Sequence, residues 1–170
     1  WTTGKIGNAL SFDGVDDYID CGTNQVDLSN SAATLEMWIK APYTHLKIAF
    51  IDGKSKLGLG FYTDSDSGNK TFIVTSASSA NTKPQPIIND WNDNVWNHVV
   101  ITYDLNHNPT CYVNGIQKNN DTEVNYWAEG SSNLYIGRRT SGNYFNGLID
   151  EVRIYNRALS ADEILQHYQA

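Results

Sequence analysis

The segment NGLIDEVRIYNRALSADEI, residues 146–164, combines the two patterns that decide the fold. Its first half, GLIDEVRIYN, alternates in side-chain character with the period of two that a β-strand requires. Its second half breaks this alternation, and the residues ADEILQHYQ place apolar side chains at helical spacing. Ser160 can cap a helix, and Glu163, three residues on, completes a capping box. The segment therefore predicts a strand followed by one short helix over residues 160–168, lying across an edge of the sheet.

The period of two recurs through most of the chain. In LEMWIK, residues 35–40, Leu, Met and Ile alternate with Glu, Trp and Lys, as in a strand with two different faces. The segments HVVITYD, TCYVNGIQ, NLYIGR, LGLGFYT and TFIVTSA repeat this behaviour and are rich in residues that favour strands. Asn114-Gly115 is a strong hairpin signal. Roughly ten to twelve short strands with this spacing predict an all-β sandwich of two antiparallel sheets.

Composition limits the classes of function. The 170 residues fit a single domain over 1–170, and a formal net charge of −7 argues against binding to nucleic acid. Five Trp and ten Tyr beside only 12 Lys and Arg suit neutral, hydroxyl-bearing ligands better than polyanions. No stretch approaches the ~18 apolar residues of a membrane span. Because the sequence opens with WTTG, we expect a domain cut from a longer polypeptide, or a mature product.

The two cysteines, Cys21 and Cys111, are separated by 90 positions. This spacing fits neither a disulfide framework nor a zinc site, which needs more ligands at short spacing. Two small buried hydrophobic residues are the favoured interpretation, and a disulfide between them is the alternative.

The stretch SFDGVDDYID, residues 11–20, places four aspartates within eight residues. Carboxylates packed this closely repel one another, so they either lie in a solvated turn or surround a cation. Gly14 lets the backbone turn so that carbonyl groups can point inward. Calcium accepts six to eight hard oxygen ligands, so its chemistry fits the stretch. The residues alone leave both interpretations open.

Three motifs together resemble a known family. GKIGNALSFDGVDDYI near the start, WNHVVITYD in the middle and NGLIDEVRIYNRALSADEI near the end resemble the laminin-G-like, concanavalin A-like jelly-roll domains. The resemblance is to the bacterial type that is appended to secreted glycan-active enzymes and adhesins, and it covers about residues 4–168. It implies an extracellular, secreted or cell-surface location, and a monomeric module within a larger chain.

The resemblance also implies one structural calcium ion that ties the N-terminal strands to the last long strand. The implied ligands are Asp13, the main chain near Gly14, Asp17 and Asp150. Asp16 and Asp20 are weaker candidates. Asp150 lies in an alternating strand, so a buried Asp150 needs a cation or hydrogen bonds.

Aromatic side chains in polar loops form a second group of candidates. Sugar rings stack their polarised C–H faces on Trp or Tyr, while their hydroxyls pair with amides, carboxylates and guanidinium groups. Trp91 in INDWNDNV and Trp127 in VNYWAEGSS are the strongest predicted contacts, and packing within the loop is the alternative for each. Tyr126, Tyr144 and Arg138 are weaker candidates, and Arg138 would otherwise be a solvated residue that balances nearby acids.

The fold also supports enzymes, so a glycoside hydrolase or polysaccharide lyase is an alternative function. Retaining hydrolases of this superfamily carry Glu-x-Asp-x-Glu, or a variant one residue longer, so that two carboxylates flank the scissile bond. The sequence contains no such triad. It therefore predicts a non-catalytic module that binds polysaccharide or oligosaccharide and targets a tethered enzyme or adhesin. A protein-binding or structural adhesion module remains the principal alternative.

Overall fold

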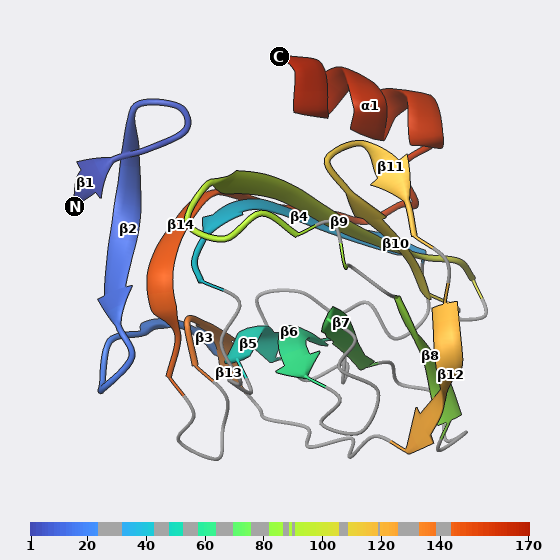
Figure 1. The fold of residues 1–170 in the computed structure, drawn as a ribbon, viewed down its shortest axis with the longest axis horizontal. Helices are drawn as coiled ribbons and strands as arrows, with labels where there is room; N and C mark the ends of the chain where they lie inside the picture. The colour runs from blue at the N-terminus through green and yellow to red at the C-terminus, as the bar shows by residue number, and fades with distance from the viewer. Residues whose placement is uncertain are drawn as a thin grey trace.

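Two antiparallel β-sheets face each other in the computed structural model of the protein (Figure 1). The structure describes residues 1–23, 32–42, 48–52, 58–63, 70–75, 82–86, 89, 91–105, 109–118, 120–125, 133–138 and 144–170. The strands are β1 (Thr2–Thr3), β2 (Asn8–Asp13), β3 (Ile19–Thr23), β4 (Ala33–Lys40), β5 (Ile48–Asp52), β6 (Gly58–Thr63), β7 (Lys70–Thr75), β8 (Thr82–Pro86), β9 (Trp96–Tyr103), β10 (Pro109–Val113), β11 (Ile116–Gln117), β12 (Asn120–Asn125), β13 (Asn133–Ile136) and β14 (Asn146–Tyr155). The helix is α1 (Ala161–Gln169).

The larger sheet has the order β1-β2-β14-β4-β9-β10-β11, the five-stranded sheet has the order β3-β13-β5-β6-β7, and β12 and β8 form a separate two-stranded sheet. β14, near the C-terminus, lies between β2 and β4, so it joins the two ends of the chain within one sheet. Ile149 of β14 is opposite Leu10 on one side and Ile39 on the other. The predicted sandwich of two antiparallel sheets with one short C-terminal helix is confirmed.

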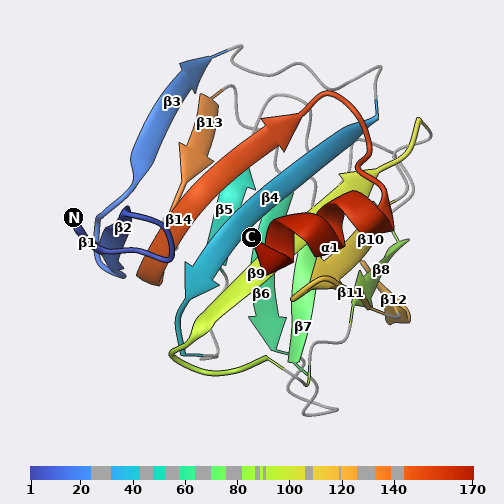
Figure 2. The same ribbon diagram turned by 90° about the horizontal axis from the view of Figure 1, so that it is seen from above.

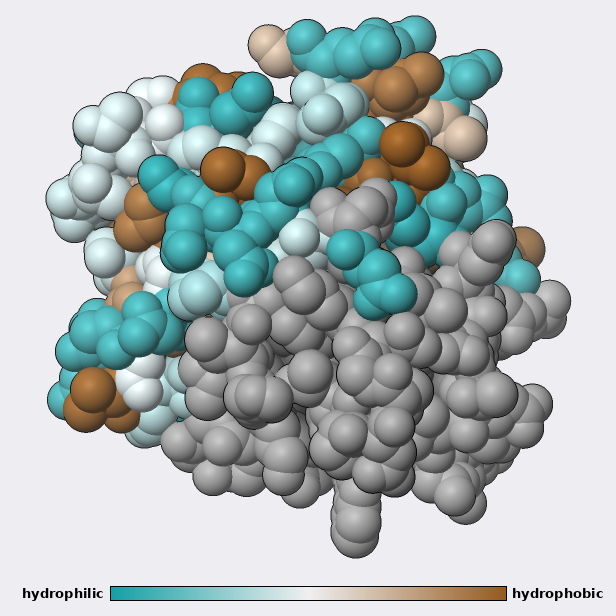
Figure 3. Space-filling model, viewed as in Figure 1, coloured by the Kyte–Doolittle hydropathy of each residue, from teal (hydrophilic) through white to brown (hydrophobic). Residues whose placement is uncertain are grey.

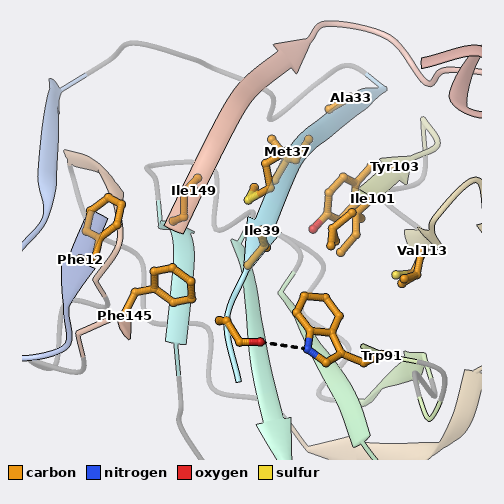
Figure 4. Packing of buried hydrophobic residues seen from close by; sticks show 14 residues of the cluster. Phe12, Ala33, Met37, Ile39, Trp91, Ile101, Tyr103, Val113, Phe145 and Ile149 are labelled. Carbon is orange, nitrogen blue, oxygen red and sulfur yellow. Dashed lines mark hydrogen bonds between the residues drawn. The ribbon is translucent and has the colours of Figure 1, made fainter. Parts of the chain in front are cut away.

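The hydrophobic core fills the space between the sheets, as Figure 4 shows. Leu35, Met37 and Ile39, which alternate along β4, all belong to it and are at most 1% exposed. Cys111 is buried against the same core, and both cysteines are free thiols. The favoured interpretation of the two cysteines is therefore confirmed for Cys111, and Cys21 is half-buried.

Helix α1 covers the outer side of the larger sheet, above β9 and β10 (Figure 2). The predicted capping box is present: the Ser160 hydroxyl accepts the backbone N–H of Glu163, whose carboxylate accepts the backbone N–H of Ser160. Ile164 is fully buried beside Val100 of β9. The described residues contain no helix with the length and hydropathy needed to cross a membrane.

Under α1, three basic side chains lie within ion-pair distance of one buried carboxylate. Glu36 of β4 is 1% exposed, and its Oε1 lies 2.9 Å from Nε2 of His98. His167 of α1 places its Nδ1 3.1 Å from Oε2 of Glu36, and Nη1 of Arg153 is 3.6 Å from Oε1. Burial on its own would raise the pKa of Glu36, but the hydrogen bonds and charges of the two histidines outweigh it and lower the pKa. The ionised Glu36 therefore fastens α1 to the sheet.

Replacing Glu36 with glutamine should lower the free energy of unfolding by about 3 kcal/mol at neutral pH, because the buried His98 and the partly exposed Arg153 and His167 lose the carboxylate that they share. Since the pKa of Glu36 is lowered in the folded state, its stabilisation is complete above the ordinary value of 4.5 and is lost as the pH falls through the lowered pKa. Urea unfolding at a series of pH values below neutrality should show this loss in the parent protein and a smaller loss in Glu36→Gln.

The matched control is Glu151→Gln, which removes a more exposed glutamate that pairs with Arg153. This variant should unfold much as the parent does. A Glu36→Gln variant with parental stability and the parental response to acid would contradict the role given to Glu36.

Candidate functional site

The outer face of β3 and β13 carries the candidate site. On β13, Leu134 and Ile136 pack against the hydrophobic core. Because side chains alternate across a strand, Tyr135 projects from the opposite face, away from the core. On β3, Ile19 packs against the core, and the register places Ile19 opposite Ile136 and Asp20 opposite Tyr135. Asp20 and Tyr135 therefore share the outer face.

Four side chains meet here, and we name them the tyrosine–arginine cluster: Tyr18, Tyr135, Arg138 and Tyr144. The guanidinium carbon of Arg138 lies 4.1 Å from the ring centroid of Tyr18 and 4.0 Å from that of Tyr135. The centroids of these two rings are 5.9 Å apart, their planes are inclined at 75°, and the Tyr144 ring lies 6.3 Å from that of Tyr18. A cation over aromatic faces at such distances is attracted by about 0.5–2 kcal/mol per pair. The cluster therefore holds two rings against one cation, with a third ring beside Tyr18.

Gly137 allows the chain to pass from the core to this face. Its φ is +85°, and a Cβ at this position would lie 2.4 Å from Cε1 of Phe12 in the core. Only glycine tolerates both conditions, and it brings the chain from Ile136, which packs against the core, to Arg138 on the outer face. Beyond it, Arg138 forms a bridge with Tyr144, and the N–H of Phe145 donates to the Gly137 carbonyl at 2.8 Å. These contacts bring together the predicted residues Arg138 and Tyr144.

The cluster has a polar neighbour on the same face. Nδ2 of Asn133 donates to both carboxylate oxygens of Asp20, each at 3.1 Å, and Oδ1 of Asp20 also accepts the N–H of Gly22. Tyr18 is 43% exposed, and the other members of the cluster are half-buried. The face therefore offers partly exposed aromatic rings, a cation and amide and carboxylate groups within one area. Such a combination can stack on a sugar ring and pair with its hydroxyls.

The four-aspartate stretch folds as a turn between β2 and β3. The carboxylates of Asp13, Asp16 and Asp17, all exposed, place ligand atoms within 4.8 Å of one another, and we name this segment the aspartate turn. Oδ2 of Asp17 accepts the N–H of Asp13 at 3.0 Å, and Oδ1 of Asp13 accepts the N–H of Val15 at 2.8 Å. Gly14 has a φ of +81° within the turn. These hydrogen bonds to backbone N–H groups explain in part why the carboxylates lie close together.

The structure does not bring Asp150 to the aspartate turn. β14 pairs with β2 so that Asn146 lies opposite Asp13. Asp150 is four residues further along β14, which places it about 13 Å from Asn146 along the strand. Asp150 is 7% exposed, and its carboxylate accepts the backbone N–H of Ile6 at 3.0 Å and that of Glu151 at 2.9 Å. These hydrogen bonds satisfy the buried carboxylate. The implied ligand set is therefore corrected: Asp150 braces the N-terminal loop and is not part of the turn.

Trp91 requires a second correction. Its ring is 3% exposed within the core, and its indole N–H donates to the carbonyl of Ala41 at 3.4 Å (Figure 4). Asn89, Asn92 and Asp93 nearby are exposed while the ring turns inward, so the ring has no free face for a sugar. The alternative interpretation, packing, is the correct one for Trp91. Trp127 and Tyr126 lie outside the described residues and stay predictions.

Sequence reasoning missed Tyr18 and Tyr135. Each is next to a core residue in an alternating segment: Tyr18 precedes Ile19, and Tyr135 stands between Leu134 and Ile136. The alternation therefore contained the signal that both tyrosines face outward. Their proximity depends on the pairing of β3 with β13, which the sequence does not reveal.

Comparisons with solved structures identify similar folds. Domain 4 of AbnA, an extracellular arabinanase from Geobacillus stearothermophilus, solved with arabinotriose, is 24% identical with a TM-score of 0.67, over 97% of this chain and 78% of that one. The pentraxin of Limulus polyphemus is 14% identical, with a TM-score of 0.61, over 91% of this chain and 78% of that one. The sialidase of Trypanosoma rangeli is 19% identical, with a TM-score of 0.63, over 97% of this chain but 28% of that one.

Likeness at these identities shows a shared fold. A search of curated protein sequences finds no match. A family model, described as the concanavalin A-like lectin/glucanases superfamily, matches residues 13–165, which is most of the chain and includes both β3 and β13. The chain therefore belongs to this family of the concanavalin A-like lectin/glucanases superfamily.

Proposed function

We propose that the protein is a non-catalytic carbohydrate-binding module of an extracellular protein, and that sugar binds on the tyrosine–arginine cluster. The observation that carries the proposal is the position of Arg138 over Tyr18 and Tyr135 on the outer face of the sheet. Arg138 covers one face of each ring, so a sugar would stack on the opposite face, and the guanidinium supplies in-plane N–H donors. Trp127 and Tyr126 remain proposed as further contacts.

The family supports this proposal because it includes lectins, and because domain 4 of the arabinanase was solved with a bound oligosaccharide. Stacking and a few hydrogen bonds on an open surface typically give about 4 to 7 kcal/mol, which is millimolar to micromolar affinity. Affinity of this order suits a module that holds a tethered enzyme or adhesin at a polysaccharide. The proposal includes that these residues form a single domain of a longer secreted chain.

A protein-binding module is the second candidate. Stable protein interfaces have an apolar centre, and large apolar patches on a surface mark such sites. In the view of Figure 3, the described surface carries small, separate hydrophobic patches among hydrophilic residues. This surface favours a hydroxyl-rich ligand over a large apolar partner.

Replacing Tyr18 or Tyr135 with alanine should weaken glycan binding at least tenfold, or about 1.4 kcal/mol, because each change removes a stacking face. A glycan array on the parent first identifies a ligand, and calorimetry with that ligand then measures each variant. Tyr135→Phe keeps the ring and should retain most of the affinity. Trp1→Ala removes an aromatic residue that is 85% exposed and lies outside the cluster, and it should bind as the parent does.

Parental affinity in a folded Tyr18→Ala/Tyr135→Ala double variant would move the site away from the cluster and leave Trp127 and Tyr126 as the next residues to test. A parent protein that binds no glycan across a broad array would favour the protein-binding candidate instead.

We also propose that the aspartate turn binds one structural calcium ion. Calcium lies 2.3–2.6 Å from its oxygen ligands, so two of its ligands are at most about 5 Å apart. The carboxylates of Asp13, Asp16 and Asp17 meet that condition, and the main chain near Gly14 is close at hand. Exposed carboxylates leave room for the water ligands that calcium also accepts. The solvated turn remains the alternative, because its backbone hydrogen bonds need no ion.

Chelator should lower the melting temperature of the parent by roughly 5–10 °C. This follows because a hundredfold excess of calcium over its Kd stabilises the folded state by about 2.7 kcal/mol. The double variant Asp13→Asn/Asp17→Asn should melt lower than the parent in calcium and should not respond to chelator. Asparagine oxygens still accept the backbone N–H groups of the turn, so the variant separates loss of charge from loss of the turn.

Asp150→Asn is the matched control, because it removes a carboxylate outside the turn and should leave the response to chelator intact. A parent protein that melts identically with and without chelator would exclude the calcium site and favour the solvated turn. In that case the double variant should be as stable as the parent or more so, because it relieves repulsion between carboxylates.

A further inference from the structure

Among the described residues, Arg138 has no acidic partner, whereas Arg153 and Arg157 each have one. Arg153 pairs with Glu151, and Arg157 pairs with Glu163 at 2.7 Å. Arg138 forms neither an ion pair nor a hydrogen bond through its side chain with a described residue, although the chain has 19 acidic residues and a net charge of −7. In so acidic a protein, a guanidinium without a carboxylate partner among the described residues points to a ligand that supplies one.

The surroundings of Arg138 fix which part of the guanidinium a ligand can reach. The rings of Tyr18 and Tyr135 lie against it at 4.1 and 4.0 Å, and its Nε is buried with no hydrogen-bond partner. The terminal nitrogens Nη1 and Nη2 are not among the buried unpaired atoms of the described residues. Both therefore keep some contact with solvent, and two N–H groups along one edge match the two oxygens of a carboxylate.

The neighbouring acids restrict the ligand. Asp20 lies on the same face, and the aspartate turn precedes Tyr18. A chain with a carboxylate on every sugar would place several negative charges against these groups, whereas a single carboxylate needs only the Arg138 edge. Asp20 is already held by Asn133, so it does not compete for the guanidinium.

We propose that Arg138 binds the carboxylate of one acidic sugar residue carried by an otherwise neutral glycan. This inference rests on the proposed function, because it names the ligand class of the same site. Uronic acids and sialic acids carry the same carboxylate chemistry, so the experiment includes both. Stacking on Tyr18 and Tyr135 orients the sugar ring, and the charged hydrogen bonds select the acid.

The test compares each acidic oligosaccharide with its own carboxyl-reduced form, which keeps the ring and its linkages. Oligosaccharides that end in glucuronic acid and in sialic acid are titrated into the parent protein, together with a polyuronate and neutral oligosaccharides. At least one acidic form should bind at least tenfold more tightly than its reduced form, which corresponds to about 1.4 kcal/mol. Added salt should reduce this preference, and the polyuronate should bind more weakly than the singly charged ligand.

Variants assign the preference to Arg138. Arg138→Gln should bring the acidic and reduced forms to equal affinity. Arg138→Lys should retain part of the preference, because lysine keeps the positive charge but lacks the paired N–H groups of the guanidinium. Arg157→Gln makes the same change at an arginine beside α1 and should keep the full preference. Circular dichroism and melting curves check that each variant is folded, while the comparison of ligands in the parent needs no variant.

The outcomes separate this inference from the proposed function. Tight binding of neutral glycans, with no preference for any acidic form over its reduced form, would overturn the inference and leave the carbohydrate-binding proposal standing. A preference that survives in Arg138→Gln would overturn the assignment to Arg138. If no glycan binds at all, both proposals fail together.

Discussion

The packing of Leu134 and Ile136 into the core is the constraint on which the candidate site depends. Full burial of such a side chain contributes about 1.5–3 kcal/mol, and these two partly buried side chains gain a share of it, so the core determines which face of β13 is hidden. A slip of one residue in the pairing with β3 would turn Tyr135 inward and bury a hydroxyl among apolar side chains. Gly137 then fits against Phe12 and delivers Arg138 to the outer face. Hydrophobic packing thus places a polar and aromatic cluster at the surface.

The two sheets have different roles. β14 joins the ends of the chain within the larger sheet, and α1 covers part of the outer side of that sheet, where it is fastened through Glu36. On the five-stranded sheet, the outer face at β3 and β13 keeps its tyrosine and arginine side chains partly exposed. The aspartate turn connects the two sheets just before Tyr18. A calcium ion bound at the aspartate turn would stabilise the backbone that leads into Tyr18. The proposed calcium site and the proposed sugar site therefore lie in one region of the fold.

Local patterns in the sequence predicted the sandwich and the C-terminal helix, because alternation and capping act over a few residues, and the resemblance of three motifs indicated the family. The site was less predictable. Polar neighbours around Trp91 indicated an exposed loop, yet a single ring can turn inward while its neighbours stay in water. Asp150 was assigned to the turn by resemblance, whereas the register of β14 on β2 separates them. Tyr18 and Tyr135 meet through strand pairing across more than a hundred residues, which no local pattern encodes.

The most direct test of the account is nuclear magnetic resonance of the protein with ring-labelled tyrosines, bound to an oligosaccharide identified on a glycan array. The account predicts nuclear Overhauser effects between protons of the sugar ring and the ring protons of Tyr18 and Tyr135. Tyr103, which is fully buried in the core, should show none and serves as the internal control. Saturable binding in which all sugar contacts come from residues outside the tyrosine–arginine cluster would contradict the account.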